Sequence, residues 1–268
     1  MLPLSGPMSM TLIANEAAKP LSGRNVDDID LRKIARKRII GSEIKWSDFY
    51  GKYRYQFING NLDQGSLNTS TTPASILGWK VFLQQVRLNG LDSIEGWPTP
   101  GDPTKPGPAP GDNNNYTGSY LAELTADVPA GLPAGTRSMR LYHSSGESAA
   151  YAIVHGPYLV CDVNNTVPLE SGDVIRFYWK AQGGSDAYDI YAYLLNVDTG
   201  ATIELANATG DSDSATTLWT PVVRTMTAEQ AGTYKFVFVS GTYDFTGGTV
   251  LGASLYVTNV DVTKWWDL

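Results

Sequence analysis

The chain has 268 residues, with 20 Lys and Arg against 27 Asp and Glu, so its formal net charge is −7. A single cysteine, Cys161, excludes a disulfide within the chain and thiolate zinc or iron–sulfur sites. Two histidines, His143 and His155, leave little room for a histidine metal centre. The hydrophobic content of 42% is enough for a core, and 18% charged residues is low for a disordered chain.

The net charge is unevenly distributed. Residues 1–57 carry 10 basic and 6 acidic side chains, a balance of +4, whereas residues 58–268 carry 10 basic and 21 acidic side chains, a balance of −11. A basic first part and an acidic remainder predict two parts with different partners. The acidic remainder argues against nucleic-acid binding, which needs a positive surface.

The first 50 residues are the part with helical patterns. Helices are predicted at Met8–Lys19, at Asp27–Ile40 and, after Ser42 as a possible N-cap, at Glu43–Tyr50. These helices carry few apolar residues, so they are expected to dock on something else rather than fold alone. No signal peptide and no membrane-spanning segment are expected, because the N-terminus lacks a basic region followed by an apolar run.

The predicted second helix carries the main positive cluster. Its simplest interpretation is a solvated helical face, and a sharper one is a docking surface for an acidic partner protein. Nucleic acid comes third, because so few charges would bind weakly. The cluster consists of Arg32, Lys33, Arg36, Lys37 and Arg38.

From Tyr53 onward the hydrophobic period changes to two. About ten short strands separated by Gly, Pro, Asn and Asp predict an antiparallel β-sandwich or jelly roll. A proline-rich stretch at 98–115 interrupts the pattern and is predicted to be a surface loop. The predicted strands are Trp79–Leu88, Tyr120–Ala126, Ser138–Tyr142, Tyr151–His155, Asp173–Ala181, Asp189–Asn196, Ala201–Leu205, Trp219–Met226, Thr233–Ser240 and Ser254–Val262.

Tyrosines on two of these strands suggest a binding face. If Ile175 and its alternating neighbours face the core, Arg176 and Tyr178 are exposed on the opposite face, and Tyr191 and Tyr193 share a face of the 189–196 strand. Exposed aromatic side chains beside polar groups can stack on sugar rings. The alternative is that these tyrosines pack against a second layer or a neighbouring subunit.

Catalytic patterns are weak. The sequence has no phosphate-binding loop, no dinucleotide fingerprint and no nucleophile elbow. Asp186 and Asp189 are the nearest candidates for the carboxylate pair of a sugar-cleaving enzyme, but acidic loop residues are usually only solvated. His155 is interpreted as a hydrogen-bonded structural histidine and Cys161 as a small buried hydrophobe. The chain is therefore predicted not to be an enzyme.

Two stretches near the N-terminus resemble structural proteins of tailed phages. The residues 41–52 (GSEIKWSDFYGK) are similar to an I-x-M-S-D-F-Y-G-K element, and Gly6–Met10 matches a G-P-I-S-M-S start that accompanies it. In that family the element closes a small helical anchoring segment. The resemblance implies that residues 1–52 dock on other virion proteins, with Trp46, Phe49 and Tyr50 taking part beside the basic cluster.

The remaining residues resemble a jelly-roll domain of marine and cyanobacterial phage virion proteins. Similar stretches include VRLNGLD at 86–92, GWPTP at 96–100 and WKAQGGSDAYD at 179–189. The opening NGNLDQ at 59–64 and the closing LYVTNV at 255–260 are also similar to jelly-roll carbohydrate-binding modules. In those modules acidic residues at both positions hold a structural Ca²⁺, which implies Asp63 as a possible ligand, although Thr258 and Asn259 replace the usual pair of aspartates.

The resemblance implies a virion protein with a helical anchor at 1–52 and a jelly-roll domain at 53–268. We expect a fibre or fibre-like appendage of the tail, neck or capsid, located in the virion, that adheres to host-surface or environmental glycans and forms a homotrimer. No cofactor, no nucleic acid and no membrane insertion are expected. A decoration or adaptor protein without a ligand, and a glycan-cleaving enzyme, are the alternatives.

Overall fold

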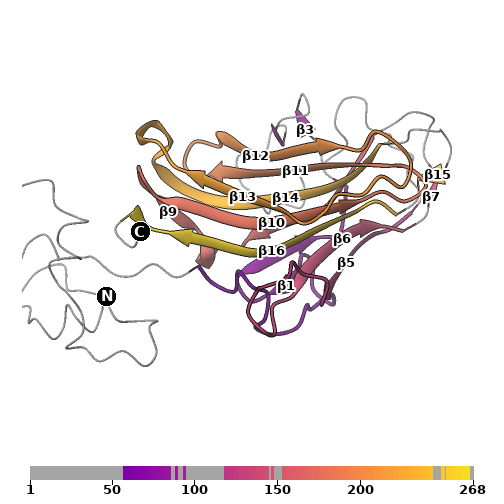
Figure 1. The fold of residues 1–268 in the computed structure, drawn as a ribbon, viewed down its shortest axis with the longest axis horizontal. Coiled ribbons are helices and arrows are strands. Elements are labelled where there is room, and N and C mark those ends of the chain that lie inside the picture. The colour runs from indigo at the N-terminus through magenta and orange to yellow at the C-terminus, as the bar shows by residue number, and fades with distance from the viewer. Residues whose placement is uncertain are drawn as a thin grey trace, which may run out of the picture.

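The computed structural model describes residues 57–85, 88–89, 93–94, 118–144, 146–147, 153–243, 249–250 and 252–265. These residues form two antiparallel β-sheets packed face to face (Figure 1). The predicted anchor at 1–52 with its docking residues, and the proline-rich loop at 98–115, lie outside the described residues. The predicted mainly-β antiparallel sandwich is confirmed.

The larger sheet has seven strands. Its central strand β14 pairs with β8 on one side and β11 on the other, and β9 pairs with the first residues of β14. Trp79 of β2 stands opposite Cys161 of β8, so the first strands of the domain extend this sheet at one edge. The strands are, in spatial order, β1 (Ala74–Ile76), β2 (Trp79–Phe82), β8 (Ile153–Cys161), β14 (Gly232–Tyr243), β11 (Ala187–Asn196) and β12 (Thr202–Thr209), with β9 (Val167–Leu169) beside β14.

The smaller sheet has five strands, and β10 and β16 run side by side along the length of the molecule (Figure 1). Consecutive strands repeatedly cross between the two sheets, as they do in a jelly roll. In spatial order the strands are β13 (Thr220–Thr225), β10 (Val174–Gln182), β16 (Ser254–Thr263), β6 (Ser138–His143) and β5 (Tyr120–Thr125).

The remaining described elements are short. Two two-stranded ribbons pair β3 (Leu88–Asn89) with β4 (Ser93–Ile94) and β7 (Gly146–Glu147) with β15 (Thr249–Val250). Two 3₁₀ helices, η3 (Val163–Asn165) and η4 (Ala228–Gln230), follow β8 and β13. Among the described residues, no helix has the length and apolar character needed to cross a membrane.

Alternating side chains from the two sheets fill the core between them. On β10 the predicted inward residues Ile175, Phe177 and Trp179 are all in this core. Phe177 meets Phe238 of the opposite sheet edge to face, with ring centroids 5.1 Å apart. Trp79 also packs on Phe238, at 6.1 Å. Aromatic pairs add to the stabilisation from burial, and the pair of Phe177 and Phe238 joins the two sheets, whereas Trp79 and Phe238 both belong to the seven-stranded sheet.

A second hydrophobic cluster lies on the other face of the seven-stranded sheet. Phe82 and Tyr158 stack within it, with ring centroids 4.7 Å apart. Tyr191 and Tyr193 belong to it and are only 3% and 1% exposed, so their predicted exposure is wrong. The reason is that both faces of the sheet are buried here, and all ten residues of β11 are buried. The predicted division of β11 is confirmed, since Ile190, Ala192 and Leu194 lie in the main core.

Candidate functional site

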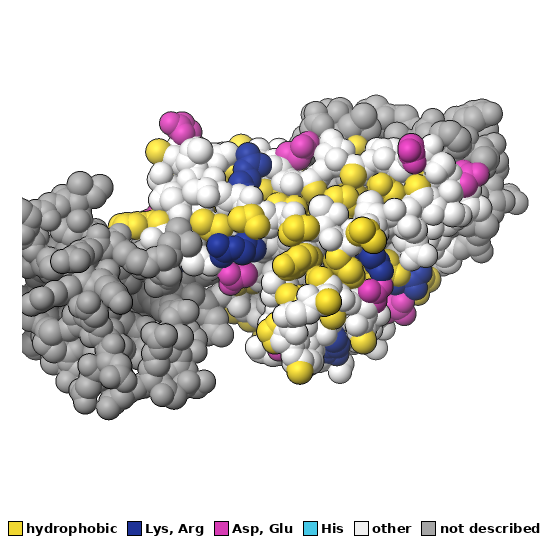
Figure 2. Space-filling view, viewed as in Figure 1, with side chains coloured by type: hydrophobic (Ala, Val, Ile, Leu, Met, Phe, Trp, Pro, Cys, Tyr) yellow, Lys and Arg dark blue, Asp and Glu magenta, His cyan; other side chains and the backbone are white. Residues whose placement is uncertain are grey.

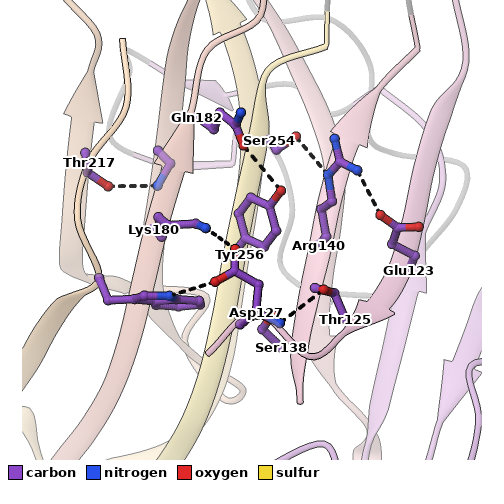
Figure 3. Close-up of polar contacts among 12 residues, drawn as sticks. Glu123, Thr125, Asp127, Ser138, Arg140, Lys180, Gln182, Thr217, Ser254 and Tyr256 are labelled. Carbon is purple, nitrogen blue, oxygen red and sulfur yellow. Dashed lines mark hydrogen bonds and ion pairs between the residues drawn. The ribbon is translucent and has the colours of Figure 1, made fainter. Parts of the chain in front are cut away.

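The outer face of the five-stranded sheet carries a row of polar and aromatic side chains. Pairing places Glu123 of β5 opposite Arg140 of β6, Arg140 opposite Tyr256 of β16, and Tyr256 opposite Lys180 of β10. Their sequence neighbours Leu141, Leu255 and Ala181 lie in the main core. Because side chains alternate along a strand, these four residues form one line across four strands on the outer face (Figure 3).

Two cations hold the aromatic rings of this row. The guanidinium of Arg140 lies 4.2 Å from the centre of the Tyr142 ring and 5.7 Å from that of Tyr256. The ammonium of Lys180 lies 4.3 Å from the centre of the Tyr256 ring and 5.4 Å from that of Trp219, which precedes β13. Cation–π contacts at these distances are attractive. The row therefore alternates positive groups and rings, with Trp219 at its end.

Carboxylates neutralise both cations. Nη1 of Arg140 is 2.8 Å from Oε1 of Glu123, and Nε of Arg140 donates to Oγ of Ser254 at 3.1 Å. Lys180 forms an ion pair with Asp127 in the loop after β5. The other oxygen of that carboxylate, Oδ1, accepts a hydrogen bond from the indole Nε1 of Trp219 at 3.2 Å. One carboxylate thus fixes both a ring and a cation (Figure 3).

Asp127 stays ionised in this arrangement. Partial burial raises its pKa, but the hydrogen bonds from Lys180 and Trp219 and the charge of Lys180 outweigh that effect, so its pKa lies below the ordinary value. Its backbone is held as well, because the carbonyl accepts a hydrogen bond from Oγ of Ser138 at 2.6 Å. The loop therefore presents a fixed negative charge to the end of the row.

The two ends of the row are accessible to a ligand, whereas Tyr256 in its middle is only 7% exposed. The side chains of Glu123 and Asp127 are 47% and 43% exposed, whereas Lys180 is 19% exposed. In the space-filling view, hydrophobic side chains gather in a band over the front of the molecule, with basic and acidic side chains interspersed along it (Figure 2). Beside Trp219, Leu218 is 88% exposed, and Val223 on the edge strand β13 is 63% exposed.

The four ligand-binding residues predicted from the sequence lie on two different sheets. Arg176 and Tyr178 lie on the outer face of β10, next to Lys180 along the same strand, and both are half-buried. Nη1 of Arg176 donates to Oγ1 of Thr263 at 2.8 Å. Tyr191 and Tyr193 lie in the other sheet, in the second hydrophobic cluster. The predicted residues therefore do not form one site.

Sequence reasoning did not identify Arg140, Tyr142, Tyr256, Lys180 or Trp219 as site residues. The outward orientation of the first two could have been predicted from alternation. Arg140 and Tyr142 alternate with the core residues Met139 and Leu141, which marks them as outward-facing. Nothing in the sequence, however, shows that β16 lies between β6 and β10 and brings Tyr256 beside them. The contacts of Tyr256 with Arg140 and Lys180 join segments that are distant in the sequence.

The acidic pair considered for sugar cleavage is buried. Asp186 and Asp189 are 0% and 2% exposed. Oδ2 of Asp189 is 2.6 Å from Nε2 of the fully buried His155, and Thr209 donates to its other oxygen. His155 is thus a hydrogen-bonded buried histidine, as predicted. Cys161 is also buried as predicted, and burial raises the pKa of its thiol to about 12.

The position implied for a structural calcium ion does not fit one. The loop at 59–65 and β16 are adjacent, since the amide of Val260 donates to the carbonyl of Gly60 at 3.1 Å. The guanidinium of Arg137 occupies this loop, with Nε donating to the carbonyl of Leu62 at 2.8 Å and Nη2 to that of Gly65 at 2.6 Å. Asp63 is exposed. Arg137 takes up oxygens that a cation would need, and its charge would repel one.

The chain has only distant similarity to known proteins. No protein-family model matches it, and no curated protein matches it. Among solved structures it is similar to TmCBM61 in complex with β-1,4-galactotriose, with 11% identity over 57% of this chain and 91% of that one and a TM-score of 0.33. It is also similar to the CBM22-2 xylan-binding domain of Paenibacillus barcinonensis Xyn10C, with 16% identity, 57% and 94% coverage and a TM-score of 0.28.

A further similarity is to the enzymatically active domain of tailspike protein 4 of bacteriophage CBA120. It has 14% identity over 55% of this chain and 18% of that one, with a TM-score of 0.31. The TM-scores of all three matches are low.

Proposed function

We propose that this chain is a glycan-binding β-sandwich protein, and that it binds sugar through the outer face of the five-stranded sheet. The observation that carries the proposal is the row that ends in Trp219, in which Tyr256 lies between Lys180 and Arg140 and Tyr142 lies against Arg140. A sugar ring has an apolar C–H face and hydroxyl groups around its edge. The half-buried rings of Trp219 and Tyr142 suit the first, while Tyr256 is only 7% exposed, and fixed donors and acceptors suit the second.

The neighbours of the row supply such donors and acceptors without unpaired charge. The hydroxyl of Tyr256 donates to Oε1 of Gln182 at 3.4 Å, and Gln182 is exposed at the end of β10. These groups are spaced along neighbouring strands, so an extended chain of sugar residues crossing the sheet would meet several of them. A flat row of this type binds each sugar weakly, and repeated copies of the protein on one particle would raise the total affinity.

Replacing Trp219 by alanine is expected to weaken polysaccharide binding by about tenfold, which corresponds to ~1.4 kcal/mol. The measurement is affinity gel electrophoresis of the full chain in xylan, β-1,4-galactan, polygalacturonate and alginate. Leu77→Ala is the matched control, because Leu77 is 54% exposed but lies next to the edge strand β1 of the other sheet. Wild-type protein that binds none of these polysaccharides, or a Trp219 variant that binds like wild type, contradicts the proposal and favours a decoration or adaptor role.

We propose that the protein is part of a phage virion. There it forms a fibre-like, homotrimeric appendage that docks on other virion proteins through residues 1–52. The charge division of the chain supports this, because a basic segment of +4 precedes an acidic domain and suits an acidic docking partner. The short resemblances at residues 6–10 and 41–52 support it too. Residues Arg32, Lys33, Arg36, Lys37, Trp46, Phe49 and Tyr50 are the proposed docking residues.

Antibodies raised against the full chain are expected to label purified phage particles in immuno-electron microscopy. Replacing Arg32, Lys33, Arg36 and Lys37 together by glutamine should remove the label from the particles while the protein is still made. Particles that show no label when the wild-type protein is present would contradict the virion assignment but not the glycan site.

A further inference from the structure

Two of the cations on the outer face of the five-stranded sheet, Arg140 and Lys180, are paired with carboxylates. Arg140 bonds Glu123, and Lys180 bonds Asp127. Further along β10, Arg176 stands opposite Asp261 of β16 in the strand register, and its Nη1 donates to the hydroxyl of Thr263 at 2.8 Å. A surface that bound an acidic ligand would offer cations with free donors, since such ligands are recognised by unneutralised Arg and Lys. At the end of the row beside Trp219, the cation Lys180 is already paired with a carboxylate.

We infer that this face selects uncharged sugar chains over acidic ones, and that Asp127 is the residue that sets the preference. The inference rests on the proposed glycan-binding function and names its ligand class. An acidic sugar placed on Trp219 would approach the Asp127 carboxylate, which accepts the indole hydrogen bond of that same ring at 3.2 Å. A carboxylate or sulfate on the ligand would therefore be repelled at the point where the ring stacks.

The position of Lys180 strengthens this argument. Its ammonium lies between the rings of Trp219 and Tyr256 and is paired with Asp127. It is only 19% exposed, so it is held in place and its charge is cancelled locally. If the Asp127 charge were removed, the same ammonium would become an unneutralised cation beside the stacking ring. One carboxylate thus decides whether the end of the row is neutral or positive.

The test is the ratio of binding to xylan, which is uncharged, and to polygalacturonate, which is acidic, measured by affinity gel electrophoresis of the full chain at low salt. Wild-type protein is expected to favour xylan. Asp127→Asn keeps an acceptor for Trp219 but loses the charge, and it should shift the ratio toward polygalacturonate by about tenfold. This gain should fall as salt is added, because it depends on Lys180. Asp127→Asn combined with Lys180→Gln should return the ratio toward that of wild type.

Asp162→Asn is the control for net charge. It removes a carboxylate that is paired with Lys80 at 3.4 Å on the other sheet, so the ratio should not change.

A wild-type protein that favours polygalacturonate, or an Asp127 variant whose ratio equals that of wild type, overturns the inference. The Trp219 variant separates the two proposals. If it loses binding while Asp127→Asn leaves the ratio unchanged, the glycan site stands and the selectivity assignment fails; if it binds like wild type, the site itself is wrong.

Discussion

Replacing Asp173 by asparagine is expected to lower the free energy of unfolding by about 3–5 kcal/mol, because it leaves a buried ammonium without its counter-charge. Asp173 is 0% exposed and forms an ion pair with Lys264, which is 2% exposed. The carboxylate also accepts hydrogen bonds from the amides of Trp265, at 2.8 Å, and Glu170, at 2.7 Å. It therefore joins the end of β16 to the turn between β9 and β10.

Thermal unfolding followed by circular dichroism measures this effect. At ~2–4 °C per kcal/mol for a domain of this size, the melting temperature should fall by roughly 6–20 °C. Combining Asp173→Asn with Lys264→Met should recover part of the loss, since the unpaired charge is then gone as well. Lys80→Met, which breaks the exposed pair with Asp162, is the control and should cost less than about 1 kcal/mol. Equal losses from the buried and exposed pairs would contradict the argument.

The second large effect is a loss of folding stability at low pH. His143 is 1% exposed, and burial together with the nearby His155 lowers its pKa from 6.5 to about 3. The folded state therefore holds this histidine neutral, while the unfolded chain protonates it below pH 6.5. Its contribution to stability is complete above pH 6.5 and is lost as the pH falls from 6.5 toward 3. Between pH 8 and pH 5 the loss from this one residue amounts to about 2 kcal/mol.

Urea unfolding of wild-type protein and of His143→Asn at pH 8 and pH 5 measures that contribution. The free energy of unfolding of the variant should fall by about 2 kcal/mol less than that of wild type between the two pH values. Thr242→Val is the control: it removes the hydroxyl 3.1 Å from Nδ1 of His143 but leaves the titrating group in place. That control should therefore retain the full pH dependence. A variant without His143 that lost as much stability as wild type would show that other groups cause the acid effect.

The strands of this domain could be predicted from sequence because alternation is a local property. The pattern in Asp173–Ala181 placed Ile175, Phe177 and Trp179 inward, and the structure has β10 at Val174–Gln182 with those residues in the core. Local pattern failed where a strand continued past a turn signal. The strand predicted to end at His155 runs on through Gly156 and Pro157 to Cys161. The strand β9 was missed because it is only three residues long and has a proline at its centre, which is unfavourable in a strand.

The candidate site could not be predicted in the same way, because it depends on which strands are neighbours. Alternation correctly put Tyr178 and Arg176 on the outer face of β10, but it also suggested exposure for Tyr191 and Tyr193 on β11. Whether the second face of a strand meets water depends on what packs on the sheet, and the sequence of the strand alone does not contain that information. The row of Arg140, Tyr256 and Lys180 required the order β6, β16, β10, which joins three distant segments.

The complete burial of β11 limits how the sequence of such a protein can evolve. All ten of its residues are buried, so a substitution there alters packing before it alters any ligand contact. The outer face of the five-stranded sheet is different, because Glu123, Arg140, Tyr178 and Lys180 on it are only half-buried or exposed. Substitutions at such positions cost little stability. We therefore expect variants with new ligand preferences to arise on the five-stranded sheet, while the sequence of β11 is held nearly constant by the fold.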